Sequence, residues 1–119
     1  MMNCGIYCIK RYLEDRGYPS EAICRRLERE LKDGQLSILT IKNVLQEGGF
    51  TVRAYCERPF KHVPDIIFDH VHGHYYLFRG RDRTFVCLSD VNHGDFRVPW
   101  PLFFLLGFKI IICIEKTVL

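Results

Sequence analysis

The sequence predicts an α+β fold in which helices in the first half pack on a mostly antiparallel sheet formed by the second half. Up to about residue 49, apolar residues recur at helical spacing. From residue 50 onward, short β-branched and aromatic runs alternate with Gly, Pro, Asp and Asn. Helices followed by strands are typical of the α+β class. Because 119 residues fit one domain, we predict a single domain spanning 1–119.

The first half predicts helices with recognisable beginnings and ends. Serines that can cap a helix precede the second and third, and glycines or prolines follow each one. The expected helices run from Cys4 to Gly17, from Ser20 to Asp33-Gly34, and from Ser37 to Gly48-Gly49. We expect Cys4 itself to cap the first helix.

The second half predicts short strands. The runs "TVRAYC", "DIIF", "HYYLFRG", "TFVCLSD" and "KIIICIE" have the composition of strands. The two runs that flank "GRDR" predict a hairpin, and "VPWPLFFLLG" predicts a short helix or turn before the last strand. We detect no internal repeat.

Composition excludes several classes of protein. The formal net charge of +3 is too small for a nucleic-acid-binding domain, and acidic residues interrupt the basic run "CRRLERELK". No signal peptide or membrane span is recognisable, and most of the six cysteines lie within apolar patterns. We therefore predict a reduced, cytoplasmic protein without nucleic-acid partners.

Three residues predict nucleophilic catalysis. Cys4 opens a helix, where the positive end of the helix dipole favours a thiolate. His74 begins one strand of the expected hairpin, and Asp90 ends the other. These two residues would therefore lie at the same edge of the sheet. With Cys4 opposite, this edge would carry a nucleophile, a base and an orienting acid.

The same residues carry a resemblance to a known family. The segments "NCGIYCIKRYLEDRGY", "SILTIKNVLQEGGF", "GHYYLF" and "LSDVNHGDFRV" resemble the papain-like cysteine peptidases that remove double-glycine leaders from bacteriocins and related secreted peptides. Those domains usually form the N-terminus of peptide-exporting ABC transporters. The resemblance implies a papain-like fold with Cys4 as nucleophile, His74 as general base and Asp90 as orienting acid. It implies no cofactor and no metal.

Two departures from the family bear on activity. Val91 follows Asp90, where the family commonly has proline. The family also places an oxyanion-hole glutamine several residues before the nucleophile, whereas only Met1, Met2 and Asn3 precede Cys4. Loss of one oxyanion donor typically costs about 100- to 1000-fold in turnover. We do not expect the amide of Asn3 to replace the glutamine, because a sequence neighbour rarely points in the right direction.

A zinc site is the alternative for the run "HVHGH". His70, His72 and His74 alternate, and on one strand they would share a face and could hold zinc. Gly73 and the surrounding polar residues indicate a loop instead, which would separate these imidazoles.

The predicted function is therefore a standalone cysteine endopeptidase that binds double-glycine leader peptides and cleaves after the small-residue pair. A catalytically impaired leader-binding or transporter-associated module remains the alternative. A separate ABC transporter is the expected membrane partner. Of the six cysteines, we expect only Cys4 to carry an activated thiol.

Overall fold

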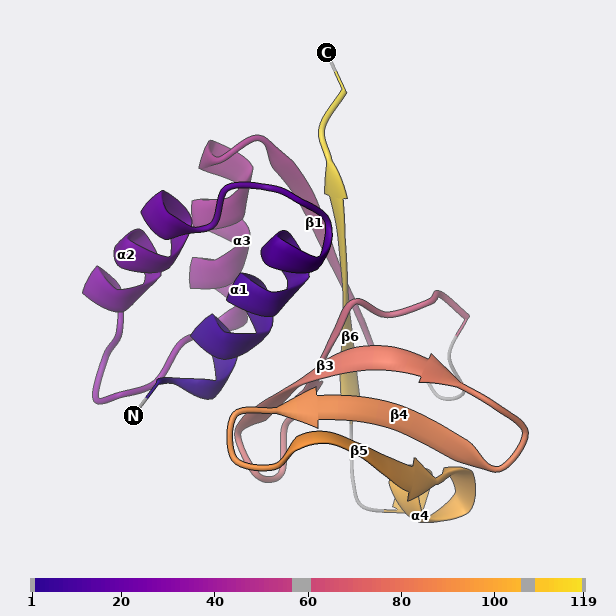
Figure 1. The fold of residues 1–119 in the computed structure, drawn as a ribbon. Coiled ribbons are helices and arrows are strands. Elements are labelled where there is room, and N and C mark those ends of the chain that lie inside the picture. The colour runs from indigo at the N-terminus through magenta and orange to yellow at the C-terminus, as the bar shows by residue number, and fades with distance from the viewer. Residues whose placement is uncertain (1, 57–60, 106–108, 119) are drawn as a thin grey trace.

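The structure is a computed structural model that describes residues 2–56, 61–105 and 109–118 (Figure 1). In it, α1, α2 and α3 lie together against one part of a sheet, and β3, β4 and β5 extend away from them toward a short fourth helix. Among the described residues, no helix is both long and apolar enough to cross a membrane.

Three helices form where the apolar spacing predicts them. They are α1 (Cys4–Asp15), α2 (Glu21–Arg29) and α3 (Ile38–Glu47). Ser37 caps α3 by accepting a hydrogen bond from the backbone N–H of Thr40 at 3.1 Å. Ser20 occupies the corresponding position before α2, but its side chain makes no capping hydrogen bond.

Two helix boundaries differ from those predicted. The second helix ends at Arg29 rather than near Asp33-Gly34, because the chain turns there and Lys32 pairs with Gln35. Cys4 does not cap the first helix. Asn3 does, because its Oδ1 accepts hydrogen bonds from the two N–H groups that follow Cys4, at 2.8 and 3.2 Å. Cys4 is therefore the first helical residue.

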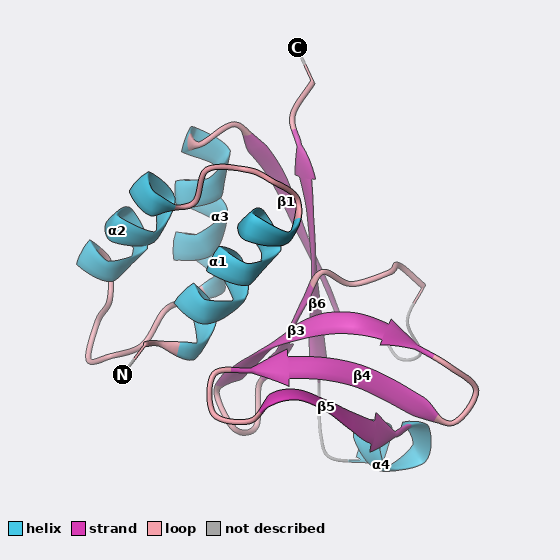
Figure 2. Cartoon of the chain, viewed as in Figure 1, coloured by secondary structure: helices cyan, strands magenta, loops and turns pink. Residues whose placement is uncertain are grey.

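The second half of the chain forms an antiparallel sheet (Figure 2). Its strand order among the described residues is β1-β6-β2-β3-β4-β5. The strands are β1 (Phe50–Cys56), β2 (Ile66–Asp69), β3 (His74–Arg81), β4 (Phe85–Asp90), β5 (Gly94–Pro99) and β6 (Lys109–Lys116). The sequence predicts all of them except β5, although its residues "DFRV" alternate between polar and apolar.

Both faces of the sheet carry buried residues, and consecutive residues of β6 show how. Ile112 packs in the cluster that α1, α2 and α3 cover, whereas Ile111 packs in a second cluster on the opposite face. Phe103 of α4 (Trp100–Leu105) is buried in that second cluster. The segment "VPWPLFFLLG" thus forms a short helix as predicted, although residues 106–108 lie outside the described part of the chain.

Candidate active site

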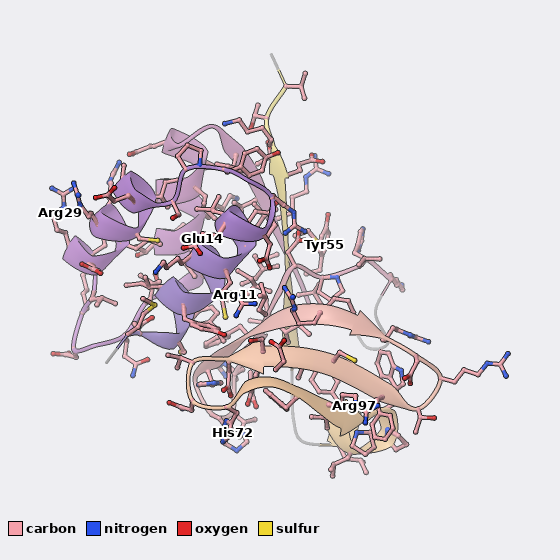
Figure 3. The ribbon with its side chains drawn as sticks, viewed as in Figure 1. Arg11, Glu14, Arg29, Tyr55, His72 and Arg97 are labelled. Atoms are coloured by element: carbon pink, nitrogen blue, oxygen red, sulfur yellow. The ribbon has the colours of Figure 1, made fainter. Side chains whose placement is uncertain are left out.

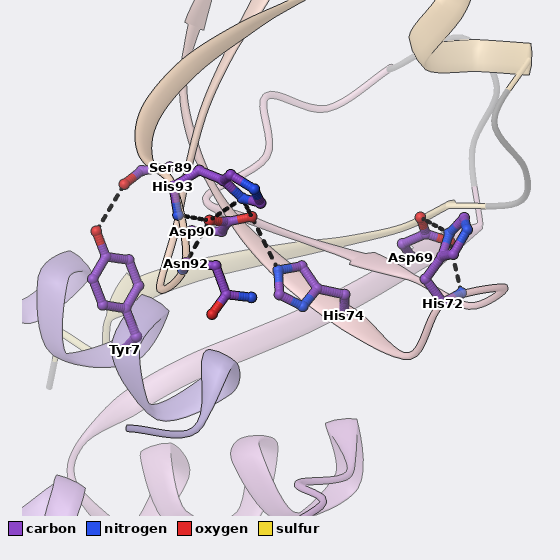
Figure 4. A network of polar contacts seen from close by, with 8 residues as sticks. All are labelled: Tyr7, Asp69, His72, His74, Ser89, Asp90, Asn92 and His93. Atoms are coloured by element: carbon purple, nitrogen blue, oxygen red, sulfur yellow. Dashed lines mark hydrogen bonds and ion pairs between the residues drawn. The ribbon is translucent and has the colours of Figure 1, made fainter. Parts of the chain in front are cut away.

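The predicted meeting of His74 and Asp90 is confirmed. Because β3 and β4 are antiparallel, the first residue of one strand and the last residue of the other lie at the same edge of the sheet. The Nε2 atom of His74 lies 3.2 Å from Oδ2 of Asp90 (Figure 4). Asp90 is buried, with 3% of its side chain exposed, whereas 20% of the His74 side chain is exposed. The pair therefore has a protected carboxylate and an accessible imidazole.

Asp90 accepts hydrogen bonds from its own turn as well as from His74. The backbone N–H groups of Asn92 and His93 donate to Oδ1 at 3.0 and 2.6 Å. The Nδ1 atom of His93 lies 3.1 Å from both carboxylate oxygens. Burial by itself would raise the pKa of Asp90, but the hydrogen bonds from His93 and His74 outweigh it and lower that pKa. Asp90 is accordingly an anion at neutral pH.

Helix α1 is fixed against this edge of the sheet by a hydroxyl pair. The hydroxyl of Tyr7 lies 2.8 Å from the hydroxyl of Ser89, the fully buried neighbour of Asp90. Arg11, one turn further along α1, donates to the Tyr7 hydroxyl at 3.0 Å. In Figure 3, Arg11 lies where α1 approaches β3.

The start of α1 also approaches β3 closely at Gly5. A Cβ atom added there would lie 3.2 Å from the ring of Tyr75 and 3.0 Å from the side chain of Leu36. A larger residue would push α1 away from the sheet, so the glycine after Cys4 has a packing reason. Tyr75 is in turn fixed by a 2.7 Å hydrogen bond from its hydroxyl to the carbonyl of Leu36.

These contacts bring Cys4 to the same corner as the pair. Cys4 and Tyr7 are three residues apart and share a side of α1, and Tyr7 is bonded to the residue before Asp90. Burial, then the charges of Asp69, Asp90 and Cys4, raise the pKa of Tyr76, whose ring lies 4.6 Å from the ring of His74. Within the described residues, however, no hydrogen bond joins the Cys4 thiol to His74.

The amide of Asn3 is already engaged, as its capping role requires. Its Oδ1 accepts from the first turn of α1, and its Nδ2 donates to the carbonyl of Gly34 at 2.8 Å. Its backbone carbonyl accepts from the N–H of Tyr7. Among the N–H groups of this first turn, the structure gives no partner within the described residues to that of Cys4. This group is available to donate a hydrogen bond to an oxyanion.

A second turn repeats the sequence pattern of the Asp90 turn. Both turns read Asp-x-x-His-Gly: "DHVHG" from Asp69 to Gly73, and "DVNHG" from Asp90 to Gly94. Oδ1 of Asp69 accepts from the backbone N–H groups of residues 71 and 72, and Oδ2 lies 2.8 Å from Nδ1 of His72. This repeat was not among the predicted features, although its sequence pattern is the signal for it.

The three histidines of "HVHGH" do not converge on one point. His70 and His72 lie in the turn between β2 and β3, and His72 and His74 contact different carboxylates (Figure 4). Within the described residues, no group of three His, Cys, Asp or Glu side chains could hold a metal ion. His72 lies at the sheet edge with the turns in Figure 3.

The cysteines differ in their surroundings. The described residues include all six, and none of these forms a disulfide. Cys8 is fully buried, and burial, followed by the nearby charges of Cys4 and Asp90, raises its pKa well above the usual range. Burial also raises the pKa of Cys24. Neither thiol is suited to ionise near neutral pH.

No protein-family model and no curated protein sequence matches this chain. Among solved structures, the chain is similar to the crystal structure of the N-terminal peptidase C39 like domain of the toxin secretion ATP-binding protein from Vibrio parahaemolyticus. The two are 14% identical, with a TM-score of 0.75, and the match covers 98% of this chain and 100% of that domain. This likeness confirms the predicted α+β, papain-like fold: the chain has the fold of a C39-like peptidase domain.

Proposed function

We propose that the protein is a cysteine endopeptidase that removes double-glycine leaders from precursor peptides. The observation that carries this proposal is the His74–Asp90 pair at the edge of the sheet beside the start of α1, where Cys4 is the first helical residue. A thiol at a helix N-terminus, an imidazole and a buried carboxylate are the groups that cysteine-nucleophile catalysis uses. The fold supports the same class.

The proposed first step is attack by the thiolate. The Nε2 atom of His74 is hydrogen-bonded to Asp90, so its Nδ1 atom is available to accept the proton of Cys4. The Cys4 thiolate then bonds to the carbonyl carbon of the scissile peptide bond, and the carbonyl electron pair moves onto oxygen. Asp90 stabilises the resulting imidazolium and fixes the orientation of its ring.

The second step releases the product and restores the enzyme. The His74 imidazolium donates its proton to the leaving amine as the peptide C–N bond breaks, which leaves the leader bound to Cys4 as a thioester. A water molecule then gives a proton to Nδ1 of His74 and attacks the thioester. The leader leaves as a carboxylic acid, and the thiolate–imidazolium pair is regenerated.

A leader-binding module with little catalytic activity is the second candidate, and one observation favours it. The engaged amide of Asn3 leaves the N–H of Cys4 as the oxyanion donor in the described first turn of α1. Oxyanion stabilisation is usually a large part of acyl-transfer catalysis, so a site to which the Asn3 amide contributes no donor would turn over slowly.

We further propose that the protein acts in the cytoplasm together with a peptide-exporting ABC transporter. The support is the name of the similar structure, which is a domain of a toxin secretion ATP-binding protein. The substrate would then be the leader of a peptide destined for export.

Incubation of the protein with a synthetic double-glycine precursor peptide tests the proposal. We expect release of the leader, detected by mass spectrometry, and loss of that release in Cys4→Ala. Cys24→Ala is the matched control, because Cys24 is also partly exposed but lies on α2, away from the pair. Binding of the peptide without cleavage, unchanged in Cys4→Ala, would select the binding module instead. If the peptide is neither cleaved nor bound, both candidates are refuted.

A further inference from the structure

We infer that His93 is a positioning residue that shares the Asp90 carboxylate with His74 and thereby weakens the hold of Asp90 on the His74 imidazolium. The inference rests on the proposed function, because it concerns the imidazole to which that function assigns the general base. It adds a residue that neither the sequence motifs nor the fold assign to the site.

Two imidazoles contact one buried carboxylate. The Nδ1 atom of His93 lies 3.1 Å from both oxygens of Asp90, and the Nε2 atom of His74 lies 3.2 Å from Oδ2. Figure 4 shows Asp90 between the two rings. A carboxylate that accepts several hydrogen bonds is a weaker acceptor for each, because its charge is shared among the donors.

The His93 ring is not needed to hold the turn. Backbone N–H groups of residues 92 and 93 already bind Oδ1 of Asp90, and the equivalent groups bind Oδ1 of Asp69 in the other turn. These bonds fix the orientation of each carboxylate. The effect of the His93 ring on His74 is therefore chiefly electrostatic.

The His93 side chain is 70% exposed, so its ring exchanges protons directly with solvent. As a neutral ring, it donates one N–H to Asp90. As a cation, it also repels a second positive charge on His74, which contacts the same carboxylate. Both the neutral and the cationic His93 ring therefore destabilise the His74 imidazolium, compared with a site in which Asp90 contacts only His74.

Other titratable groups lie near this site. Cys4, Cys8 and Tyr7 approach from α1, Asp69 lies opposite His74 on β2, Tyr76 lies beside His74 on β3, and Asp95 follows on β5. A comparison of single substitutions within one background holds these groups constant. Each variant then differs from the wild type only at its substituted residue.

The consequence for catalysis concerns the proton shared by Cys4 and His74. Destabilising the imidazolium returns that proton to sulfur, so the reactive thiolate is lost at a higher pH than it would be without His93. His93 therefore raises the lowest pH at which the site is active. Removal of its ring should extend thiol reactivity to lower pH.

The direct test is an NMR titration of the ¹⁵N-labelled His74 ring in the wild-type protein, His93→Ala and His72→Ala. We expect His93→Ala to move the titration midpoint of His74 upward by about half a pH unit or more. His72→Ala is the matched control, because it removes the same ring from the repeated turn, whose Asp69 makes no hydrogen bond to His74 among the described residues. Its midpoint shift should be less than half as large.

A midpoint unchanged in His93→Ala, or moved as far in His72→Ala, would overturn the inference. If His93→Ala does not fold, His93→Leu decides, because leucine fills a similar space but can neither donate to Asp90 nor carry a charge. Its midpoint should still move upward, and an unchanged value would again overturn the inference. The titration requires no substrate, so its outcome is independent of whether the peptide is cleaved.

Discussion

The two Asp-x-x-His-Gly turns have the same local structure but different neighbours. Each begins with a buried aspartate whose Oδ1 accepts two backbone N–H groups. Each ends with a glycine in the left-handed region, Gly73 at φ 62° and Gly94 at φ 64°. Because β2, β3, β4 and β5 are consecutive in the sheet and antiparallel, both turns lie at the same edge.

The turns differ in what the second carboxylate oxygen contacts. Oδ2 of Asp69 lies 2.8 Å from the ring of its own turn's histidine. Oδ2 of Asp90 has a longer contact of 3.1 Å with His93 and also binds His74 at 3.2 Å. His74 lies directly opposite Asp69 in the β2–β3 register, yet it bonds to the more distant chain segment.

The register of β3 and β4 accounts for this choice. Leu77 pairs with Ser89, so continuing the register by one residue sets Asp90 opposite Tyr76, two residues from His74 on the same face. A diagonal neighbour at that spacing is within reach of an imidazole. The motif therefore determines the turn, whereas the adjacent strand determines whether its carboxylate belongs to the candidate site.

The largest effect expected from this difference is on thiol reactivity. Asp90→Asn keeps an oxygen that can accept the turn's N–H groups but removes the charge that stabilises the His74 imidazolium. The thiolate fraction of Cys4 should then fall, and its alkylation by limiting iodoacetamide at mildly acidic pH should slow by about 10- to 100-fold. Peptide mapping by mass spectrometry measures the labelling of each cysteine.

Asp69→Asn is the matched control for that experiment. It makes the same chemical change in the repeated turn, and we expect Cys4 labelling to stay within about twofold of the wild-type rate. Equal slowing in both variants would contradict the conclusion that only the Asp90 carboxylate belongs to the candidate site. If wild-type Cys4 is labelled no faster than the exposed Cys56, then Cys4 and His74 do not form a thiolate–imidazolium pair.

The sequence is sufficient to predict most of the elements but not the contacts between distant segments. Helical spacing and glycine stops locate α1 and α3, and hairpin geometry predicts that His74 meets Asp90. The cap at Asn3 agrees with the preference for asparagine at the N-cap position, which the prediction of Cys4 as the cap overlooked. The additional hydrogen bond from Asn3 to the carbonyl of Gly34 is a tertiary contact that the sequence does not indicate. The strand β5 is missed because its pairing with β4 stabilises residues that are only half-buried.

The part of the candidate site played by His93 could not be predicted from the sequence either. A histidine in an exposed turn is ordinarily a solvated residue, and its contact with Asp90 follows from the conformation of the turn. Likewise, no local pattern indicates that Tyr7 reaches Ser89, 82 positions later in the chain. Such contacts depend on the tertiary packing of α1 against β3 and β4.

A second, smaller effect concerns stability in acid. Burial opposes ionisation of Asp90, but its hydrogen bonds from His93 and His74 give it a net lowered pKa in the folded protein. A lowered pKa stabilises the fold above the unfolded value near 3.8, and this contribution is lost as the pH falls through the folded value. Wild type should therefore exceed Asp90→Asn in unfolding free energy by about 1–2 kcal/mol at pH 7.

Urea unfolding at a series of pH values from 7 downward measures this difference. It should remain constant while the carboxylate is ionised in both states, and it should shrink below about pH 4 as the unfolded chain and then the folded protein take up the proton. A difference that stays the same down to pH 2.5 would mean that the Asp90 charge does not contribute to stability.

The smallest effect expected is that of the hydroxyl pair that fixes α1 beside the Asp90 turn. Tyr7→Phe removes the 2.8 Å hydrogen bond with Ser89. Among the described residues, no corresponding hydrogen bond joins α1 to the Asp69 turn. Without the bond to Ser89, the start of α1 should sample more positions relative to His74. We expect Cys4 alkylation at mildly acidic pH to slow by about threefold. The His74 imidazolium stabilises the Cys4 thiolate less when the two side chains are held together less closely.

Tyr12→Phe is the control on the same helix. It removes a 2.9 Å hydrogen bond from the Tyr12 hydroxyl to the carbonyl of Ile114, at the far end of α1 from Cys4. Both variants should lose about 1–2 kcal/mol of unfolding free energy, since each leaves a buried polar group without its partner. Only Tyr7→Phe should slow the labelling of Cys4. Equal slowing in the two variants would mean that general loosening of α1, rather than its tie to the Asp90 turn, controls the reactivity of the thiol.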